Sequence, residues 1–352
     1  MKARVLWTLG VAGAGAVACG ARTPLLVPDG GECLGTFVPV DVENPVLYFL
    51  LDHSGSMAEM DKWPNMRSVI AELMTELGPR ARFGAAMFPA QSTSDECATG
   101  AEVMPVQLGD SQGTAAGVFL AATSLAPTGG TPTAATVEAL TPELASFPEL
   151  TFAILATDGG PNCDAALSCD ASTCTSNMDN TPNCPTGGPP NCCDPTTGIG
   201  GLGCLDGART AAAVTSLQAA GVRTFVLGIP GSAPYAAVLD SLAQAGGTAR
   251  ATEPYYYSVD TADTTALATG LAQIAQQAAF GCTLLLPQPP PDPAEVNLYV
   301  GGNVVPQDGP NGWTVAGSRL TLLGSTCAAV VGTDGMPTQA LRVLEGCATV
   351  TQ

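Results

Sequence analysis

Two apolar runs of the chain each end in an aspartate, and the two carboxylates could help to hold a metal ion. The run PVLYFLLD (45–52) ends in Asp52, and the run TFAILATD (151–158) ends in Asp158. Continuous apolar runs fit parallel strands that are covered on both faces, and ligands bind outside the carboxyl ends of such strands. If the two strands are neighbours, both carboxylates lie at one edge of the sheet, where their mutual repulsion favours a cation between them.

Hydroxyl groups near these carboxylates complete a ligand set made only of oxygen. Ser54 and Ser56 follow the first aspartate at alternate positions, which turns both hydroxyls to the same side. The loop PTGGTPT (127–133) offers Thr131 and Thr133, and Thr131 is favoured because it directly follows the Gly pair. Hard oxygen ligands of this kind suit Mg²⁺ or Mn²⁺. Because hydroxyls are neutral, an open or water-filled position on the metal would attract a carboxylate from a partner.

Together, these segments resemble the metal-ion-dependent adhesion site of von Willebrand factor type A domains. DHSGS (52–56) matches the DxSxS motif of the family, GGT (129–131) matches its threonine loop, and TDG (157–159) matches its second aspartate. The resemblance covers about residues 45–281 and implies a doubly wound, mostly parallel α/β sheet. It also implies that an acidic residue of a protein ligand fills the open position on the metal. The metal ligands that it implies are Asp52, Ser54, Ser56, Thr131 and Asp158.

Further strands and helices are expected between these segments, as a doubly wound sheet requires. RFGAAMFP (82–89) and VRTFVLGIP (222–230) are short apolar runs and are predicted strands. Helices are predicted over 64–77, 207–221 and 260–281, where apolar residues recur at helical spacing. The alternation of strands and helices favours an α/β architecture.

Two regions depart from the family pattern. Residues 159–207 hold seven cysteines among many Gly, Pro, Asn and Asp residues, and are predicted to be a disulfide-stapled surface insertion that covers the metal site or shapes its specificity. Because seven is odd, one of these cysteines should pair outside the insertion, and Cys97 is the obvious candidate. Residues 282–352 contain the linker PQPPPDP (287–293) and are predicted to form a small β-rich segment with a hairpin at VNLYVGGNVVP (296–306).

The N-terminal segment has the pattern of an export signal. A basic start precedes an apolar stretch that is too short to span a bilayer, and AVAC (16–19) resembles a bacterial lipobox, in which Cys19 is lipidated. We expect a signal peptide over 1–18 and a lipid-anchored linker over 19–44. The lipid would be the only membrane contact of a cell-envelope protein, with the outer membrane or cell surface favoured over the inner membrane.

The cysteine count independently favours an oxidising compartment. Of 13 cysteines, setting Cys19 aside leaves 12 that can all pair. Reduced or zinc-bound thiols are the alternative, which the single histidine, His53, and the lack of a repeated CxxC pair disfavour. We predict that Cys33 and Cys282 clasp the domain. The disulfide candidates are Cys33, Cys97, Cys163, Cys169, Cys174, Cys184, Cys192, Cys193, Cys204, Cys282, Cys327 and Cys347.

Composition excludes some classes of function. The chain has 12 Lys and Arg against 31 Asp and Glu, a net charge of −19, which repels phosphate backbones and makes nucleic acid an unsuitable partner. No P-loop, GxSxG motif or GxGxxG motif in a βαβ context occurs, and no lysine is expected near the strand ends. His53 should point away from the metal, between two residues that point toward it. The chain is therefore predicted not to be an enzyme.

The leading hypothesis is a metal-dependent adhesion or protein-binding module at the cell envelope. One alternative is a structural envelope protein whose metal site only stabilises the fold, and a weaker one is a metal-dependent hydrolase. A second cation site formed by Asp164, Asp170 and Asp179 is disfavoured, because these residues lack EF-hand spacing.

Overall fold

The chain forms two compact units, which are described separately. The computed structural model describes residues 24–26, 32–90, 95–178, 192–194, 199–259, 263–278, 282–330 and 339–351. The larger unit comprises Val42–Leu284 and Cys327–Thr338, and the smaller unit Met1–Asp41, Leu285–Thr326 and Gln339–Gln352. Cys19, Asp179 and Cys184, for which we made predictions, lie outside the described residues. No helix among the described residues is long and apolar enough to cross a bilayer.

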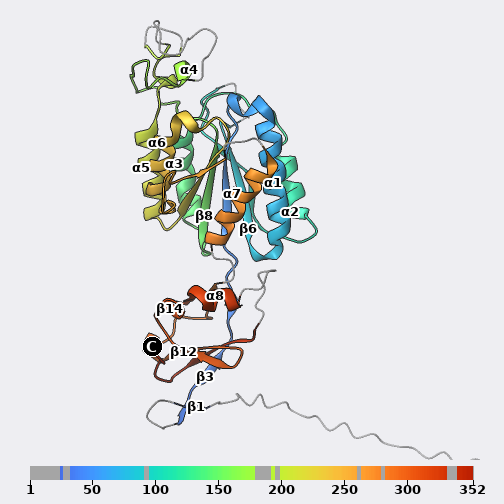
Figure 1. Cartoon of the computed structure of the whole chain (residues 1–352), viewed down its shortest axis with the longest axis vertical. Coiled ribbons are helices and arrows are strands. Elements are labelled where there is room, and N and C mark those ends of the chain that lie inside the picture. The colour runs from blue at the N-terminus through green and yellow to red at the C-terminus, as the bar shows by residue number, and fades with distance from the viewer. Residues whose placement is uncertain are drawn as a thin grey trace, which may run out of the picture. The chain divides into compact units, whose positions relative to one another are not determined.

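A six-stranded sheet with the order β10-β9-β8-β5-β6-β7 forms the centre of the larger unit (Figure 1). Neighbouring strands are parallel except for β6 and β7, which are antiparallel. The strands are β5 (Val46–Asp52), β6 (Arg82–Phe88), β7 (Ala101–Leu108), β8 (Thr151–Thr157), β9 (Arg223–Gly228) and β10 (Tyr257–Ser258). The four predicted strands are thus all present, and their order is that of a doubly wound sheet.

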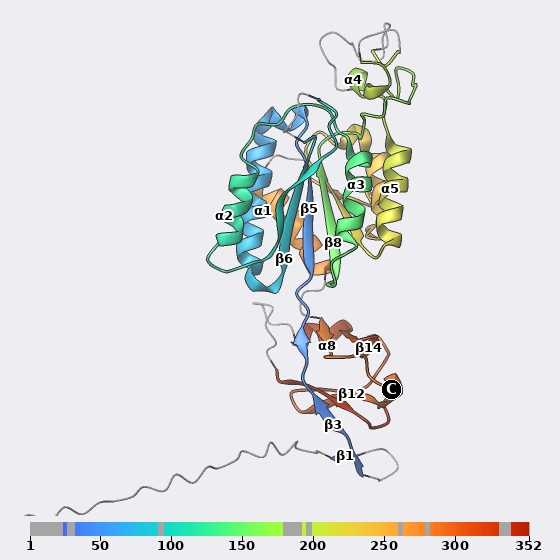
Figure 2. The same ribbon diagram turned by 180° about the vertical axis from the view of Figure 1, so that it is seen from behind.

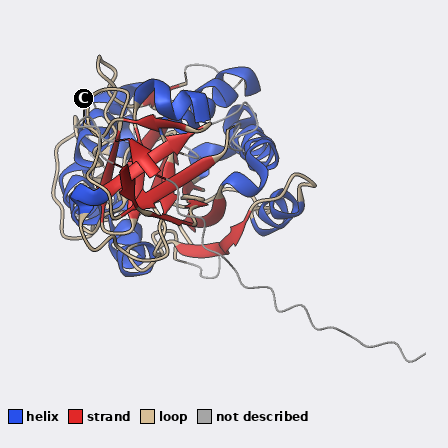
Figure 3. Ribbon diagram, turned by 90° about the horizontal axis from the view of Figure 1, so that it is seen from below, coloured by secondary structure: helices blue, strands red, loops and turns tan. Residues whose placement is uncertain are grey.

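Helices cover both faces of this sheet, as the views from opposite sides show (Figures 1 and 2). Figure 3 distinguishes the helices, in blue, from the strands, in red. One face carries α1 (Lys62–Leu77), α2 (Thr114–Ala122) and α7 (Thr264–Gln277), and the other α3 (Thr133–Leu144), α5 (Gly207–Ala219) and α6 (Ala236–Ala245). The helices α1 and α5 match the predicted helices to within two residues, and α7 lies within the predicted range 260–281.

Strand β5 contributes side chains to both apolar cores, one on each face of the sheet. Leu47, Phe49 and Leu51 belong to the cluster on one face of the sheet, whereas Tyr48 and Leu50 belong to the cluster on the other. Alternate side chains of a strand point to opposite faces, so a strand covered on both faces is apolar throughout. Every residue of β5 is buried, including the aspartate that ends it. The uninterrupted apolar run therefore has a direct structural cause.

The order of the strands reverses between β5 and β8. From β5 the chain continues to β6 and β7 on one side and then crosses to β8, β9 and β10 on the other. The strands β5 and β8 are parallel neighbours, with Leu51 opposite Ala156 in the last pair of their register. In open α/β sheets, such a switch point is where ligands bind, outside the carboxyl ends of the strands. The fold thus places the ends of both predicted aspartate-bearing strands side by side.

The smaller unit contains a sheet of antiparallel strands with the order β13-β12-β16-β3. A second sheet has the order β14-β15-β11-β4; β14 and β15 are antiparallel, and β4 and β11 each include residues of both units. The predicted hairpin is present, with Gly301 and Gly302 at positive φ between β12 and β13. These strands are β3 (Thr36–Val38), β4 (Asp41–Val42), β11 (Thr283–Leu285), β12 (Val296–Val300), β13 (Asn303–Val305), β14 (Trp313–Ala316), β15 (Arg319–Leu322) and β16 (Leu341–Glu345).

The prediction of a linker over 19–44 is wrong for its last part. Strand β3 pairs with β16, and the ring of Phe37 packs edge-on against Tyr299 with centroids 5.7 Å apart. A short hairpin of β1 (Pro24–Leu26) and β2 (Glu32–Leu34) precedes β3. The Pro- and Gly-rich composition predicted a linker. A strand of three residues can nevertheless form when the edge of another strand is available for hydrogen bonding, and here β16 provides that edge.

The disulfides only partly follow the predictions. Cys97 pairs with Cys163, the pairing outside the insertion that the odd count indicated. The predicted clasp between Cys33 and Cys282 is wrong, because Cys33 pairs with Cys347 and Cys282 with Cys327. The strand pairing of β3 with β16 brings residues near 33 and 347 together, which the sequence alone does not show. The insertion also contains the pairs Cys169–Cys204 and Cys174–Cys193.

Short helical segments occur between these elements. They are η1 (Gly55–Asp61), η2 (Gly78–Arg80), α4 (Thr175–Met178), η3 (Gly200–Gly203), η4 (Ala233–Tyr235), η5 (Pro293–Glu295) and α8 (Gly324–Val330). The segment η1 contributes to the site described next, because it begins directly after β5 and Ser54.

Candidate metal centre

The three segments predicted to form one site meet at the switch point of the sheet. The backbone N–H of Gly55 donates a hydrogen bond to the carbonyl oxygen of Gly129 at 3.0 Å, and that of Thr128 donates to the carbonyl oxygen of His53 at 2.9 Å. These two bonds join the loop after β5 to the threonine loop. Strand β8 ends at Thr157 beside β5, so the loop that carries Asp158 completes the group.

A chain of hydrogen bonds links four of the five predicted ligands. The backbone N–H of Ser54 donates to Asp52 Oδ1 at 2.9 Å, and the hydroxyl oxygens of Ser54 and Ser56 lie 3.2 Å apart. The hydroxyl of Ser56 donates to Asp158 Oδ1 at 2.8 Å. In an octahedron with metal–oxygen distances of about 2.1 Å, neighbouring oxygens lie about 3.0 Å apart. The spacing of these hydroxyl and carboxylate oxygens therefore fits a Mg²⁺-sized ion.

The fifth predicted ligand, Thr131, lies outside this chain but is held beside it. Its backbone N–H donates to Asn162 Oδ1 at 2.8 Å, and its carbonyl oxygen accepts the N–H of Asn162 at 2.9 Å. Thr133 begins α3 and its N–H donates to the same carbonyl oxygen at 2.8 Å. The backbone of Thr131 is thus fixed by the first residues of the cysteine-rich insertion. Sequence reasoning did not identify Asn162.

The disulfide between Cys97 and Cys163 lies against the threonine loop. A Cβ atom placed on Gly130 would come within 2.6 Å of the Cys163 sulfur and 3.4 Å of the Cys97 sulfur. This contact explains why glycine precedes Thr131, since a side chain there would displace the disulfide. The start of the insertion therefore shapes one edge of the candidate site.

A lysine that sequence reasoning missed forms part of the site. Lys62 Nζ donates to Asp158 Oδ2 at 2.6 Å and to the carbonyl oxygen of Ser56 at 3.2 Å. The side chains of Lys62 and Asp158 are only 3% and 1% exposed. The expectation that no lysine lies near the strand ends is therefore wrong. Left-handed backbone at Met60 and Asp61, with φ values of 51° and 55°, turns the chain so that α1 begins next to the carboxylates.

The two carboxylates of the site are electrostatically unequal. Asp158 has an ion pair with Lys62, whereas no lysine or arginine among the described residues forms an ion pair with Asp52. Burial, followed by the nearby charge of Asp158, raises the pKa of Asp52 to about 7, although hydrogen bonds from Ser54 and Thr157 act in the opposite direction. One ammonium group thus faces two carboxylates. A buried set of oxygen donors with excess negative charge fits a hard divalent cation.

The site is open to the surface on one side. Asp52, Ser54 and Asp158 are buried, whereas Ser56 is partly exposed and Gly55 is exposed. A group from outside would therefore approach past Gly55 and Ser56. His53 lies away from this side, because its Nε2 is 3.0 Å from the carbonyl oxygen of Leu125 and its ring packs edge-on against Trp63.

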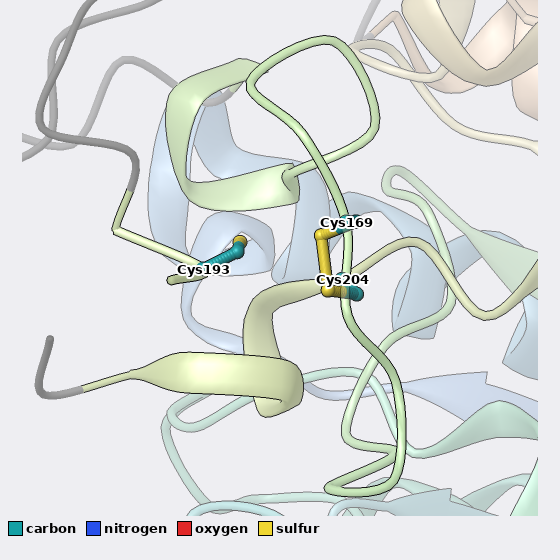
Figure 4. Close-up of side chains that lie close together, drawn as sticks. All are labelled: Cys169, Cys193 and Cys204. Atoms are coloured by element: carbon teal, nitrogen blue, oxygen red, sulfur yellow. A yellow bond between two sulfur atoms is a disulfide. The ribbon is translucent and has the colours of Figure 1, made fainter. Parts of the chain in front are cut away.

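The other acidic and cysteine groups that could bind a metal have different partners in the structure. Asp164 forms an ion pair with Arg209, and Asp170 accepts hydrogen bonds from Ser172 and Thr173 within its own turn. The sulfur atoms of Cys169, Cys193 and Cys204 lie within 4.8 Å of one another (Figure 4). All three belong to disulfides, so they are not available as thiolate ligands.

Comparisons with known proteins identify structural similarities at low sequence identity. No family model and no curated protein matches the chain. Pilus adhesin SpaC from Lactobacillus rhamnosus GG is 13% identical, with a TM-score of 0.48 over 92% of this chain, which spans 44% of SpaC. The vWF domain of the type V pili tip protein Mfa5 from Porphyromonas gingivalis is 13% identical, with a TM-score of 0.45 over 67% of this chain and 95% of that domain.

A third similar structure has zinc in its metal site. Proximal thread matrix protein 1 from the mussel byssus, with a zinc-occupied MIDAS motif, is 15% identical, with a TM-score of 0.39 over 69% of this chain and 49% of that one. At these identities and TM-scores, the similarities establish neither a family nor a function for this chain.

Proposed function

We propose that the larger unit is a domain of the von Willebrand factor type A kind that binds a divalent cation, Mg²⁺ or Mn²⁺, and through it an acidic group of a protein partner. The observation that supports this most directly is the chain of hydrogen bonds from Asp52 through Ser54 and Ser56 to Asp158. It lies at the switch point of a doubly wound sheet, where ligands bind. It also carries more negative charge than its one ammonium group compensates.

In this proposal each residue has a distinct task. The hydroxyls of Ser54 and Ser56 bind the ion together with Asp52 and Asp158, whose carboxylates also supply its counter-charge. Thr131, held by Asn162, lies on the adjoining loop and contributes its hydroxyl. The ion, when bound, offers a positively charged position that accepts a carboxylate. Because the carboxylates are buried and Ser56 is partly exposed, the acidic group enters from the side of Ser56.

The proposed setting is the cell envelope, with the chain anchored by lipid on Cys19 and binding a protein there. One disulfide of the larger unit, Cys97–Cys163, lies beside the site and another, Cys169–Cys204, staples the insertion, which suits an oxidising compartment. The proposed activity is binding without catalysis. A protein whose ion only stabilises the fold would bind the metal but show no dependence of its metal affinity on carboxylates.

Isothermal titration of the full chain with Mn²⁺ and Mg²⁺ tests the metal site. Wild-type protein should bind one ion, and Asp52→Ala should abolish binding while keeping the fold. Asp170→Ala, which removes an exposed carboxylate from the turn near Ser172, is the matched control and should bind as wild type does. Unchanged affinity in Asp52→Ala would contradict the proposed site. Equal binding with and without added acetate would favour the purely structural role.

A further inference from the structure

The buried ammonium group of Lys62 is an unusual component of a cation site. Lysine is almost never fully buried unless it is paired, and here the pair is with one of the two carboxylates that would hold the metal. Among the described residues, the ion pairs of the larger unit other than this one lie between partly exposed side chains. Lys62 therefore carries a fixed positive charge inside the site.

The ammonium group and the hydroxyl chain use different oxygens of the same carboxylate. Lys62 binds Oδ2 of Asp158 at 2.6 Å, and the Ser56 hydroxyl binds Oδ1 at 2.8 Å. A metal ion next to the hydroxyls of Ser54 and Ser56 would approach Asp158 from the Oδ1 side. The ion pair and the metal can therefore be present at the same time, and Lys62 does not have to leave.

The loop after β9 closes over the ammonium group. A Cβ atom on Gly231 would come within 3.2 Å of Lys62 Nζ and 3.3 Å of the carbonyl oxygen of Asp158, and Gly231 has a φ of 111°. The backbone thus approaches Lys62 closely at a residue that only glycine readily accommodates. With little room for water on this side, the charge of Lys62 is poorly screened within the site.

We propose that Lys62 determines the specificity of the site for acidic ligands, an inference that rests on the proposed metal site. With two aspartates, one ammonium group and a divalent ion, the loaded site keeps one net positive charge. That charge lowers the affinity for the metal alone and is neutralised when a carboxylate from a partner arrives. Metal and acidic ligand therefore strengthen each other's binding, because coupling between two ligands is reciprocal.

The test compares Lys62→Met, which removes the charge and keeps an unbranched side chain, with Lys62→Arg, which keeps the charge. Mn²⁺ is titrated into the full chain by calorimetry, in sodium acetate and in sodium chloride of equal ionic strength. Even at the dielectric constant of water, a unit charge about 5 Å from a divalent ion changes its affinity more than about tenfold. Lys62→Met should therefore bind Mn²⁺ at least about tenfold more tightly than wild type in chloride, and Lys62→Arg should resemble wild type.

Acetate provides the second readout. It should tighten Mn²⁺ binding in wild type and in Lys62→Arg, and do so less in Lys62→Met. If wild type binds Mn²⁺ and Lys62→Met binds it equally or more weakly, the inference is overturned while the proposed metal site stands. If neither protein binds Mn²⁺, the proposed function fails together with the inference. Should Lys62→Met not fold, Lys62→Gln takes its place, and Mn²⁺ binding by that variant equal to or weaker than that of wild type would again overturn the inference.

Discussion

Replacing the two site aspartates one at a time by asparagine should have opposite effects on the stability of the metal-free protein. Asp158→Asn leaves the buried ammonium group of Lys62 without its counter-charge. Removing one partner of a buried ion pair destabilises a protein by about 3–5 kcal/mol. For a unit of this size, 1 kcal/mol changes the melting temperature by about 2–4 °C, so the loss should be roughly 6–20 °C.

Asp52→Asn should be neutral or stabilising under the same conditions. Asp52 is fully buried, and burial together with the charge of Asp158 raises its pKa to about 7, so its ionised form is unfavourable in the folded state. Asparagine removes that charge and keeps an oxygen for the N–H of Ser54, which now binds Oδ1. Its NH2 group, in place of Oδ2, can donate to the Thr157 hydroxyl oxygen, whose own proton is within reach of the Gly159 carbonyl oxygen. The two variants therefore separate the paired aspartate from the unpaired one.

The assay is thermal and urea unfolding at pH 8 in EDTA, followed by circular dichroism. The double variant Lys62→Met/Asp158→Asn should lose less stability than the sum of the two single variants, since neither charge is then left unpaired. Equal destabilisation by Asp52→Asn and Asp158→Asn would refute the reasoning, because it would mean that the Lys62 ion pair does not distinguish the two carboxylates.

Four further expectations follow from the same contacts. In EDTA, the free energy of unfolding should fall as pH rises from about 4 to about 7. The raised pKa of Asp52 means that the folded protein still holds a proton that the unfolded chain has lost. Asp52→Asn should flatten this slope in urea titrations. Mg²⁺ at about 100-fold over its Kd should stabilise wild type by about 2.7 kcal/mol, whereas Asp52→Ala should melt alike in Mg²⁺ and EDTA. Asn162→Ala removes the acceptor of the Thr131 N–H and should speed hydrogen exchange at that amide roughly fivefold, with Asp170→Ala as the unchanged control. Cys19→Ser should release the protein from the membrane fraction, and sedimentation of the variant with membranes would contradict lipid anchoring.

The local sequence was sufficient to predict the strands that carry the site. The apolar runs of β5 and β8 are long, uninterrupted and followed by aspartates, because both strands are covered on two faces. The edge strands β7 and β10 were missed for the opposite reason. Strand β7 contains Pro105 and has mixed exposure, and β10 has only two residues, so neither has a clear pattern.

The pairing of the chain's two ends was not predictable from the sequence. Cys33 and Cys347 are 314 residues apart and meet because β3 pairs with β16, a pairing that no local pattern reveals. The composition of residues 19–44 predicted a linker. The short edge strands in this stretch were missed because such strands need few apolar residues. Where several cysteines are available, their pairing is decided by which strands lie side by side.

The order of residues along the chain was enough to predict the chemical types in the site, which are two carboxylates and neighbouring hydroxyls at the ends of parallel strands. The balance of their charges depends on contacts that form only in the folded unit. Lys62 follows Ser56 by six residues, and a turn through left-handed residues brings its ammonium group onto Asp158 and not Asp52. Asn162, 31 residues after Thr131, fixes the threonine loop in the same way. Charge balance depends on distances of a few ångströms, and these arise from packing of the whole unit, which spacing along the chain does not encode.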